Sequence, residues 1–436
     1  MPAVLPESRA RTSRSTPTAR GSRSADPRSA RPRGSRERGA PRGRVSRFGR
    51  PAARLGPADC QVLWLYLLTR ISVWITAYCV RWLFPRDSGT REPAAVLAPF
   101  ERWDWGHYLN IARDGYFPAS FPASFPARSG AGEGDWDNRE AFFPGFPLLL
   151  RAVHTVIPNW TAAGLLISFV AGAVAVVALA RIARLHLPGT DAGRRAVVFF
   201  LLSPCAIFLA AGYTEALFLA LALPAWLAAQ RHHWPLAAVL TALATTVRVS
   251  GLFLAAALAV HFLLTARTRR HWRGLPWLAL PALPVACHTW YLHAHTGDWM
   301  AWKHAQERGW RRTFHAPWDA WAHTWQAAFD GTQSTGFAFM FQAELLAMLA
   351  GVLLLGLLLW RRRWPEATYL GLTLCALGTS YWYMSVPRST LLWWPLWIGL
   401  AAWSLRRPWV RGVYLCLAAP LTTVFAVTFL SGRWAG

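Results

Sequence analysis

The sequence predicts an all-α integral membrane protein, built as a polytopic bundle of about eleven transmembrane helices with two long extracytoplasmic loops. Three observations lead to this fold class. Apolar stretches long enough to cross a bilayer recur from residue 61 onward. Hydrophobic residues make up 54% of the 436 positions, and only 15% are charged. The charged residues lie mainly between the apolar stretches rather than within them. These features exclude a single soluble globular domain and a collagen-like chain.

The first segment, residues 1–56, is expected to be a disordered basic tail on the cytoplasmic side. It is composed of Arg, Ser, Pro, Ala and Gly, with almost no large apolar side chains before Phe48. Such a composition cannot bury enough apolar surface to offset chain entropy. The tail holds about half of the net charge of +25. We expect a solvated segment attracted to anionic head groups, and no nucleic-acid partner.

The remainder, residues 57–436, is predicted to be one membrane-embedded domain. A helix needs about 20 residues to cross the hydrocarbon core. Asp, Glu and Lys are nearly absent from the candidate stretches, as their insertion cost requires. The predicted spans are 61–84, 160–183, 195–212, 214–230, 234–247, 250–266, 275–293, 337–360, 366–384, 389–405 and 409–431.

Orientation follows from the arginines, which favour cytoplasmic loops. If every span crosses, the arginine clusters and the tail fall on one side, and most acids fall on the other. The acid-rich loops, about 85–159 and 294–336, are therefore predicted to be extracytoplasmic. This pattern predicts a multi-pass protein of the cell membrane with a cytoplasmic N-terminus.

The two long loops are longer than simple connectors, so we expect them to carry function. In the first loop, residues 100–116 and 141–158 have apolar residues at helical spacing and are predicted to be short amphipathic helices. Between them lies a Phe-Pro-Ala-Ser repeat at 117–127, which predicts a mobile insertion.

Polar clusters that could support chemistry all fall on the predicted outer side. The first is Arg102-Trp-Asp104-Trp-Gly-His107-Tyr108. A carboxylate between two Trp residues would be partly desolvated, and Asp, His and aromatic rings suit sugar binding and proton abstraction. The alternative, an interfacial aromatic belt with a solvated Asp, is equally compatible with the composition.

Four further clusters follow along the chain. Glu215 lies where two spans turn, so it is either a functional carboxylate or a helix-capping acid. Arg248 and Arg388 are single arginines beside apolar segments, and each requires a carboxylate or phosphate partner. The segment after Gly297 supplies Asp298 and Lys303, and leads to Trp310-Arg-Arg312.

Other chemistry has little support. Asp135-Trp-Asp137 has the spacing of a DxD metal motif, but two acids at this spacing recur by chance, so no metal site and no cofactor are predicted. Walker A, GxGxxG, HExxH and GxSxG sequences do not occur, which argues against ATP-driven transport and hydrolase chemistry.

At these residues the chain resembles a family. Trp103-Asp104 with His107-Tyr108, Ala141-Phe-Phe-Pro-Gly-Phe-Pro147, Ala211-Gly-Tyr-Thr-Glu215, Arg248 and Pro387-Arg388 are similar, in this order, to motifs of the PIG-V family. That family includes the second mannosyltransferase of GPI-anchor assembly and bacterial relatives, and the chain resembles one of the latter. The resemblance covers residues 60–430. Two departures are the inserted repeat and Ser389 after Arg388, where relatives often have Tyr.

The resemblance implies a GT-C fold and a mannosyltransferase that uses a polyprenyl-phosphate sugar donor on the outer face. The acceptor would be a membrane lipid or a glycan. The first-loop carboxylate of the family matches Asp104.

The residues support the same mechanism. An inverting transfer needs one base for the acceptor hydroxyl and cations for the departing phosphate. Asp104 is the expected catalytic base, and Arg248, Arg388, Lys303 and His107 are candidates for phosphate contacts. Arg102, Tyr108, Glu215 and Asp298 complete the expected substrate-binding set. The alternatives are a lipid-linked sugar flippase or a non-catalytic membrane partner of a transferase.

Overall fold

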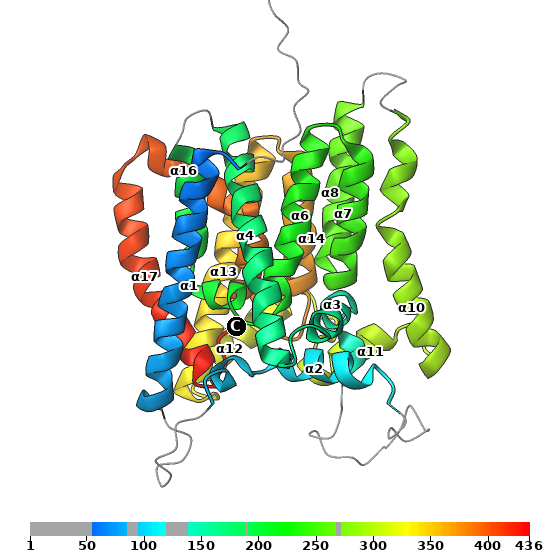
Figure 1. The fold of residues 1–436 in the computed structure, drawn as a ribbon, viewed down its shortest axis with the longest axis vertical. Helices are drawn as coiled ribbons and strands as arrows, with labels where there is room; N and C mark the ends of the chain where they lie inside the picture. Colours follow the sequence, from blue (N-terminus) through cyan, green and yellow to red (C-terminus); the bar gives the residue numbers. More distant parts are fainter. Residues whose placement is uncertain (1–54, 85–94, 119–137, 188–190, 267–271) are drawn as a thin grey trace, which may run out of the picture. The chain divides into compact units, whose positions relative to one another are not determined.

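The structure is a computed structural model that describes residues 55–84, 95–118, 138–187, 191–266 and 272–436 (Figure 1). Three predictions lie outside these residues: the basic tail up to residue 54, the Phe-Pro-Ala-Ser repeat beyond residue 118, and the acidic pair Asp135 and Asp137. Residues Leu55–Gly436 form one unit.

The described residues form helices and no strands, which confirms the all-α fold class. Four helices are long and apolar enough to cross a membrane, and three more are apolar but shorter. The predicted number of eleven spans therefore remains a prediction. The four long helices are α1 (Pro57–Leu83), α4 (Trp160–His186), α13 (Thr335–Trp360) and α17 (Trp409–Leu430). The three shorter apolar helices are α6 (Thr214–Gln230), α7 (Trp234–Val247) and α8 (Ser250–Thr265). Further helices of the bundle are α5 (Asp191–Leu201), α10 (Ala282–Thr296), α14 (Trp364–Gly378) and α16 (Trp394–Arg406).

Several predicted spans are interrupted, and prolines account for the breaks. In the predicted span 195–212, α5 ends at Leu201 and a 3-10 helix, η3 (Pro204–Leu209), follows. The predicted span 389–405 contains the end of α15 (Val386–Ser389), η5 (Thr390–Leu392) and then α16, which has a proline in its first turn. Because proline has no N–H and clashes with the preceding turn, it suits a helix start rather than a helix interior.

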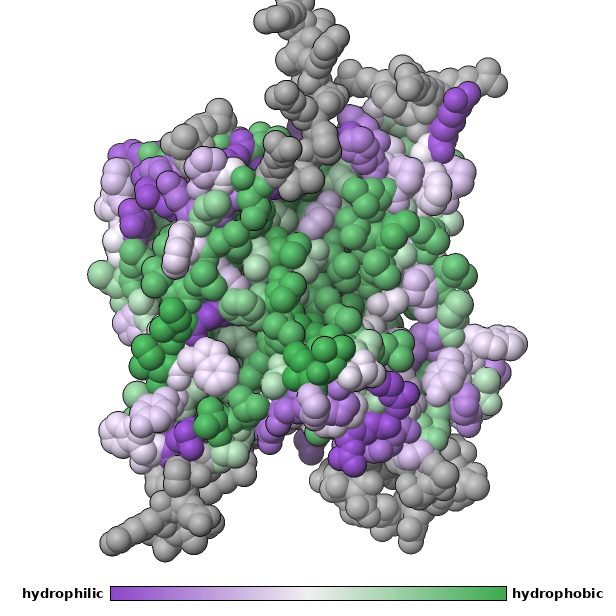
Figure 2. Space-filling view, viewed as in Figure 1, coloured by the Kyte–Doolittle hydropathy of each residue, from purple (hydrophilic) through white to green (hydrophobic). Residues whose placement is uncertain are grey.

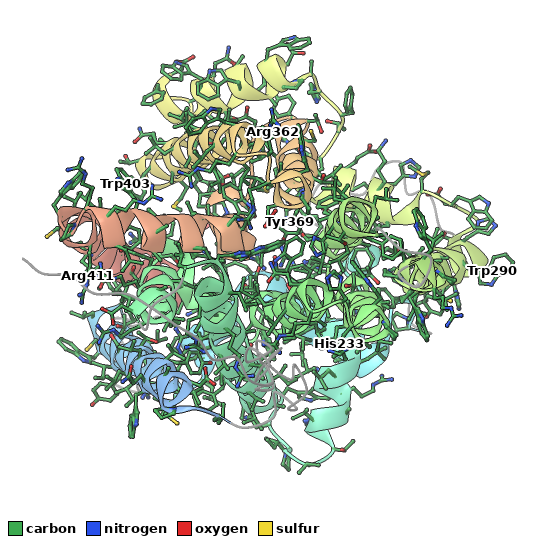
Figure 3. The ribbon with its side chains drawn as sticks, turned by 90° about the horizontal axis from the view of Figure 1, so that it is seen from above. His233, Trp290, Arg362, Tyr369, Trp403 and Arg411 are labelled. Atoms are coloured by element: carbon green, nitrogen blue, oxygen red, sulfur yellow. The ribbon has the colours of Figure 1, made fainter. Side chains whose placement is uncertain are left out.

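On the face shown in Figure 2, apolar side chains cover the middle of the helices, and polar side chains gather at both ends. One end is rich in arginine, and Figure 3 looks down on it, with Arg362 and Arg411 labelled. At this end Asp59 of α1 binds Arg181 and Arg184 of α4, with N–O distances of 2.8 and 2.5 Å. These ion pairs link the beginning of α1 to the end of α4.

The opposite end carries the short helices α2 (Asp104–Asp114), α3 (Gly145–His154), α11 (Ala301–Trp310) and α12 (Pro317–Phe329) (Figure 1). Helices α2 and α3 lie within the two segments predicted to be amphipathic. The two long loops meet here, because the Trp302 and Gln306 side chains both donate to the carbonyl of Ala141, at 3.1 and 2.9 Å. Segments far apart in the sequence thus contact each other at this end of the bundle.

Candidate active site

A cavity of about 800 Å³ opens at the end of the bundle that carries α2, α11 and α12. Aromatic side chains contribute much of its wall. Four cationic side chains also line it, and among the described lining residues Asp104 is the single acid. The cations are Arg248, Lys303, Arg312 and Arg388. A cavity with this balance is suited to a ligand that has an anionic group and an apolar part.

Four charged side chains from distant segments form a continuous chain beside this cavity. Asp104 Oδ2 accepts a hydrogen bond from Arg388 Nη1 at 2.6 Å. Arg388 Nε donates to Glu215 Oε1 at 2.5 Å, and Arg248 Nη1 donates to the same oxygen at 2.6 Å. We call Asp104, Arg388, Glu215 and Arg248 the charge chain. Its two acids and two arginines alternate in sign, so each guanidinium has a carboxylate partner.

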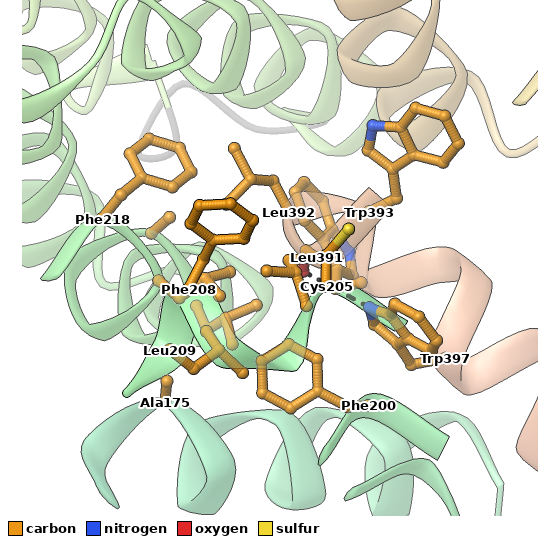
Figure 4. Close-up of a cluster of buried hydrophobic side chains, with 14 of the residues drawn as sticks. Ala175, Phe200, Cys205, Phe208, Leu209, Phe218, Leu391, Leu392, Trp393 and Trp397 are labelled. Carbon is orange, nitrogen blue, oxygen red and sulfur yellow. Dashed lines mark hydrogen bonds between the residues drawn. The ribbon is translucent and has the colours of Figure 1, made fainter. Parts of the chain in front are cut away.

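Arg388 is the buried centre of the charge chain. Its guanidinium carbon lies 4.6 Å from the ring centroid of Phe208 and 4.8 Å from that of Tyr213. Phe208 belongs to η3 and to a cluster of buried apolar side chains that also contains Leu391 and Trp393 (Figure 4). Aromatic faces attract a cation, and this attraction grows when water is excluded. The break in the predicted span 195–212 therefore supplies one side of the Arg388 site.

The turn before Arg388 is held by Glu344, a fully buried carboxylate of α13. Its two oxygens accept the backbone N–H groups of Ser385 and Val386 at 2.7 and 2.8 Å. Ser385 has a φ of 67°, in the left-handed region that a non-glycine residue rarely adopts. Glu344 satisfies the N–H groups at the start of α15, and it fixes the helix that carries Arg388.

Asp104 begins α2, directly after a strained residue. Trp103 has φ 50° and ψ −120°, and its indole Nε1 donates to the carbonyl of Arg433 at 3.1 Å. Non-glycine residues in such sparsely populated regions cost about 1–3 kcal/mol and are concentrated at functional sites. Asp104 Oδ1 has no hydrogen-bond partner among the described residues, so one carboxylate oxygen is open to a ligand.

Close packing on two glycines also positions α2. The ring of Trp105, next to Asp104, lies against Gly164 and Gly212, and a Cβ atom on either glycine would come within 2.6 Å of that ring. We expect Gly212→Ala to lower the free energy of unfolding by about 1–3 kcal/mol, because the ring must move to make room. Thermal unfolding of the purified protein in detergent would measure this change. Gly106→Ala is the matched control, since no atom lies within 4 Å of its Cβ position. Equal stability of the two variants would contradict the role of this packing.

Five of the predicted site residues, Asp104, Tyr108, Arg248, Lys303 and Arg388, line the cavity. Burial, followed by the nearby charge of Asp104, raises the pKa of Tyr108 above its ordinary value, so its hydroxyl is neutral. Lys303 pairs with Glu307 at 3.4 Å on the partly exposed side of α11. Glu215 lies behind the wall and is fully buried.

Three other predicted residues, Arg102, His107 and Asp298, are not among the lining residues. Arg102 Nη2 donates to the carbonyl of Leu430 at 3.3 Å. The His107 ring stacks on Phe142 at a centroid distance of 4.8 Å. Phe142 is a lining residue, so the His107 ring packs against the cavity wall.

Asp298 belongs to a turn at the start of α11. Its Oδ2 lies 2.6 Å from His304 Nδ1, and its Oδ1 accepts the backbone N–H of Met300 at 2.8 Å. Partial burial opposes the charged form of Asp298, but these hydrogen bonds outweigh it and hold its pKa below the ordinary value. The geometry makes Asp298 part of the loop structure rather than of the cavity wall.

Sequence reasoning missed Arg312 and Glu344 as site residues. Arg312 lies in the Trp310-Arg-Arg312 segment, where its positive charge was the feature that indicated a possible site residue. Glu344 had a stronger signal, since it is an acid inside the predicted span 337–360 and intramembrane carboxylates usually have a function. Among the described residues, no group of three or more His, Cys, Asp or Glu side chains could hold a metal ion.

Comparison with known proteins gives one family. Residues 95–268 match the family model described as Mannosyltransferase (PIG-V). This range contains Asp104, Glu215 and Arg248, and Arg388 lies beyond it.

The similar curated proteins are all named GPI alpha-1,6-mannosyltransferase 2. The chain is 30% identical to the Mus musculus protein over 244 residues, which is 52% of this chain and 45% of the relative. It is 33% identical to the Cricetulus griseus protein over 190 residues, which is 41% of this chain and 34% of the relative. The match to the Homo sapiens protein is 34% over 169 residues, covering 36% of this chain and 30% of the relative. The matched segments thus span less than half the length of these relatives.

Proposed function

We propose that the chain, which is similar to the PIG-V family of mannosyltransferases, is a membrane glycosyltransferase that transfers mannose to a lipid-linked or glycan acceptor. We further propose that the donor is a polyprenyl-phosphate mannose. The observation that carries the proposal is the position of Asp104, which is the single acid among the described residues that line the cavity and which shares it with four cations.

The reaction would require a base and a cationic environment. Asp104 would take the proton of the acceptor hydroxyl while that oxygen attacks C1 of the sugar. The bond between C1 and the phosphate oxygen would break, and its electron pair would leave with the phosphate. Because the attack occurs on the face opposite the leaving group, the configuration at C1 would invert. Positioned general bases contribute about 10²–10⁴-fold to such steps.

The charge chain would hold the base in place. Arg388 fixes Oδ2 of Asp104, which leaves Oδ1 for the acceptor hydroxyl. Glu215 balances the charge of both arginines, so Arg388 can remain buried beside Phe208 and Tyr213. Arg248 would add positive charge on the side of Thr214, whose hydroxyl lies 2.6 Å from Arg248 Nη1. Preorganised groups of this kind need not reorganise during the reaction.

A transfer assay tests the proposed function. The full chain, purified into lipid nanodiscs, is expected to move radiolabelled mannose from polyprenyl-phosphate mannose to a component of a total lipid extract. Liberated polyprenyl phosphate should appear in equal amount. A lack of product with every acceptor fraction, together with translocation of the lipid-linked sugar across reconstituted vesicles, would overturn the proposal and favour a flippase.

A further inference from the structure

Among the four cations of the cavity, Arg312 differs from the other three in its surroundings. Arg388 and Arg248 bind the carboxylates of the charge chain, and Lys303 pairs with Glu307. The Arg312 side chain has no hydrogen bond or ion pair to any described residue, and its Nε atom is buried without a partner. It is therefore the cation of the wall whose charge is not matched by a bonded acid.

The local backbone explains how Arg312 reaches the cavity. Helix α11 ends at Trp310, and Arg311 follows with a φ of 49°, in the left-handed region. The backbone N–H of Arg312 donates to the carbonyl of Gln306 at 3.4 Å, which closes the end of the helix. After this turn Arg312 lines the cavity, whereas the Arg311 guanidinium lies over the Trp382 ring at 5.5 Å. Two adjacent arginines thus have different surroundings.

The electrostatic environment of Arg312 favours an added anion. Burial, followed by the positive charge of Arg248, lowers the pKa of the Arg312 guanidinium from its ordinary value. Glu344 and Asp104 act in the opposite direction, but each is already bonded elsewhere, to the turn at Ser385 and to Arg388. Arg312 is partly buried, and a charge that is partly withdrawn from water without a paired counter-charge is costly, so a ligand that brings a negative charge would stabilise this wall.

We infer that Arg312 is the anion-binding residue of the cavity and that it contacts the phosphate of a polyprenyl-phosphate ligand. This inference rests on the proposed function for the identity of the lipid. A guanidinium presents a planar fork of N–H donors that matches two phosphate oxygens. The charge chain then positions Asp104, and Arg312 binds the phosphate. The aromatic lining, which includes Trp310 and Phe314, supplies apolar surface for the first isoprene units.

Binding of farnesyl phosphate, a short polyprenyl phosphate, tests the inference without reference to turnover. Titration calorimetry on the protein in nanodiscs should show tighter binding of farnesyl phosphate than of farnesol or inorganic phosphate. Arg312→Gln should weaken farnesyl phosphate binding about 10- to 100-fold, because one charged hydrogen-bonding partner is lost. Arg312→Gln should leave farnesol binding unchanged. Strong binding of inorganic phosphate alone would show a free-phosphate site and overturn the lipid assignment.

Two further variants make the result decisive. Arg311→Gln removes the same charge one residue away, outside the lining set, and should bind farnesyl phosphate as the unchanged chain does. Arg312→Lys keeps the positive charge but loses the planar set of guanidinium N–H donors, so it should weaken farnesyl phosphate binding by less than Arg312→Gln does. If Arg312→Gln does not fold, Arg312→Lys takes its place in the binding measurement. Equal binding by all variants would overturn the inference while transfer by the unchanged chain would still support the proposed function. Binding that depends on Arg312, in the absence of any transfer, would support the anion site and count against the proposed function.

Discussion

Asp104→Asn is expected to lower the rate of mannose transfer by about two to four orders of magnitude, the contribution that a positioned general base makes. The amide keeps the shape of the side chain and can still accept a hydrogen bond from Arg388, so the fold should be retained. It cannot take a proton from the acceptor hydroxyl. The measurement is the initial rate of transfer from radiolabelled polyprenyl-phosphate mannose at saturating donor.

Asp114→Asn is the matched control for this experiment. Asp114 is the last residue of the same helix, α2, and its side chain is exposed. It should transfer at the unchanged rate. Thermal unfolding of both variants separates a chemical effect from a folding effect. Full activity in a correctly folded Asp104→Asn protein would show that another group acts as the base.

Part of this site could be predicted from the sequence because charged side chains are costly inside a membrane, so those that occur beside apolar segments are few and stand out. Asp104, Glu215, Arg248 and Arg388 occur at the ends of apolar segments, all on the predicted outer side. The structure brings these four residues into direct contact at one end of the bundle. A lone arginine beside an apolar segment requires an anionic partner, so the expectation that each arginine meets an acid or a phosphate followed from solvation energy.

The pairing itself could not be predicted, because it depends on how the helices break. Pro204 is a signal for a break after α5, but it does not show that the following 3-10 helix places Phe208 beside Arg388. The position of Arg312 in the cavity wall could not be predicted either, because it depends on the left-handed backbone conformation of Arg311. Asp298 does not line the cavity, and the structure places it in a local turn with His304, a contact that the sequence did not indicate.

Glu344 shows how a buried acid can act through the backbone. As the acid of the predicted span 337–360, it could have been identified as a functional candidate from the sequence. Its partners could not, because they are the N–H groups of a turn that begins 41 residues later. The structure makes it a support for Arg388, and through Arg388 for Asp104.

Glu215→Ala is expected to have the largest effect on stability of any single substitution in the charge chain. Glu215 is fully buried, and one of its oxygens accepts from both Arg388 and Arg248. Its removal leaves Arg388, whose side chain is 8% exposed, without that carboxylate. Breaking a buried ion pair by removing one partner costs about 3–5 kcal/mol. The midpoint of thermal unfolding in detergent should therefore fall sharply, and transfer should be lost with it.

Two comparisons show whether the loss comes from the unpaired arginines. Glu307→Ala removes an acid from the partly exposed pair with Lys303 and should cost less than about 1 kcal/mol, as surface pairs do. Glu215→Ala combined with Arg388→Ala should cost less than the sum of the single changes, because the double variant leaves one fewer buried charge unpaired. If Glu215→Ala were as stable as Glu307→Ala, or if the two changes were additive, the charge chain would not be what holds Arg388 beside Asp104.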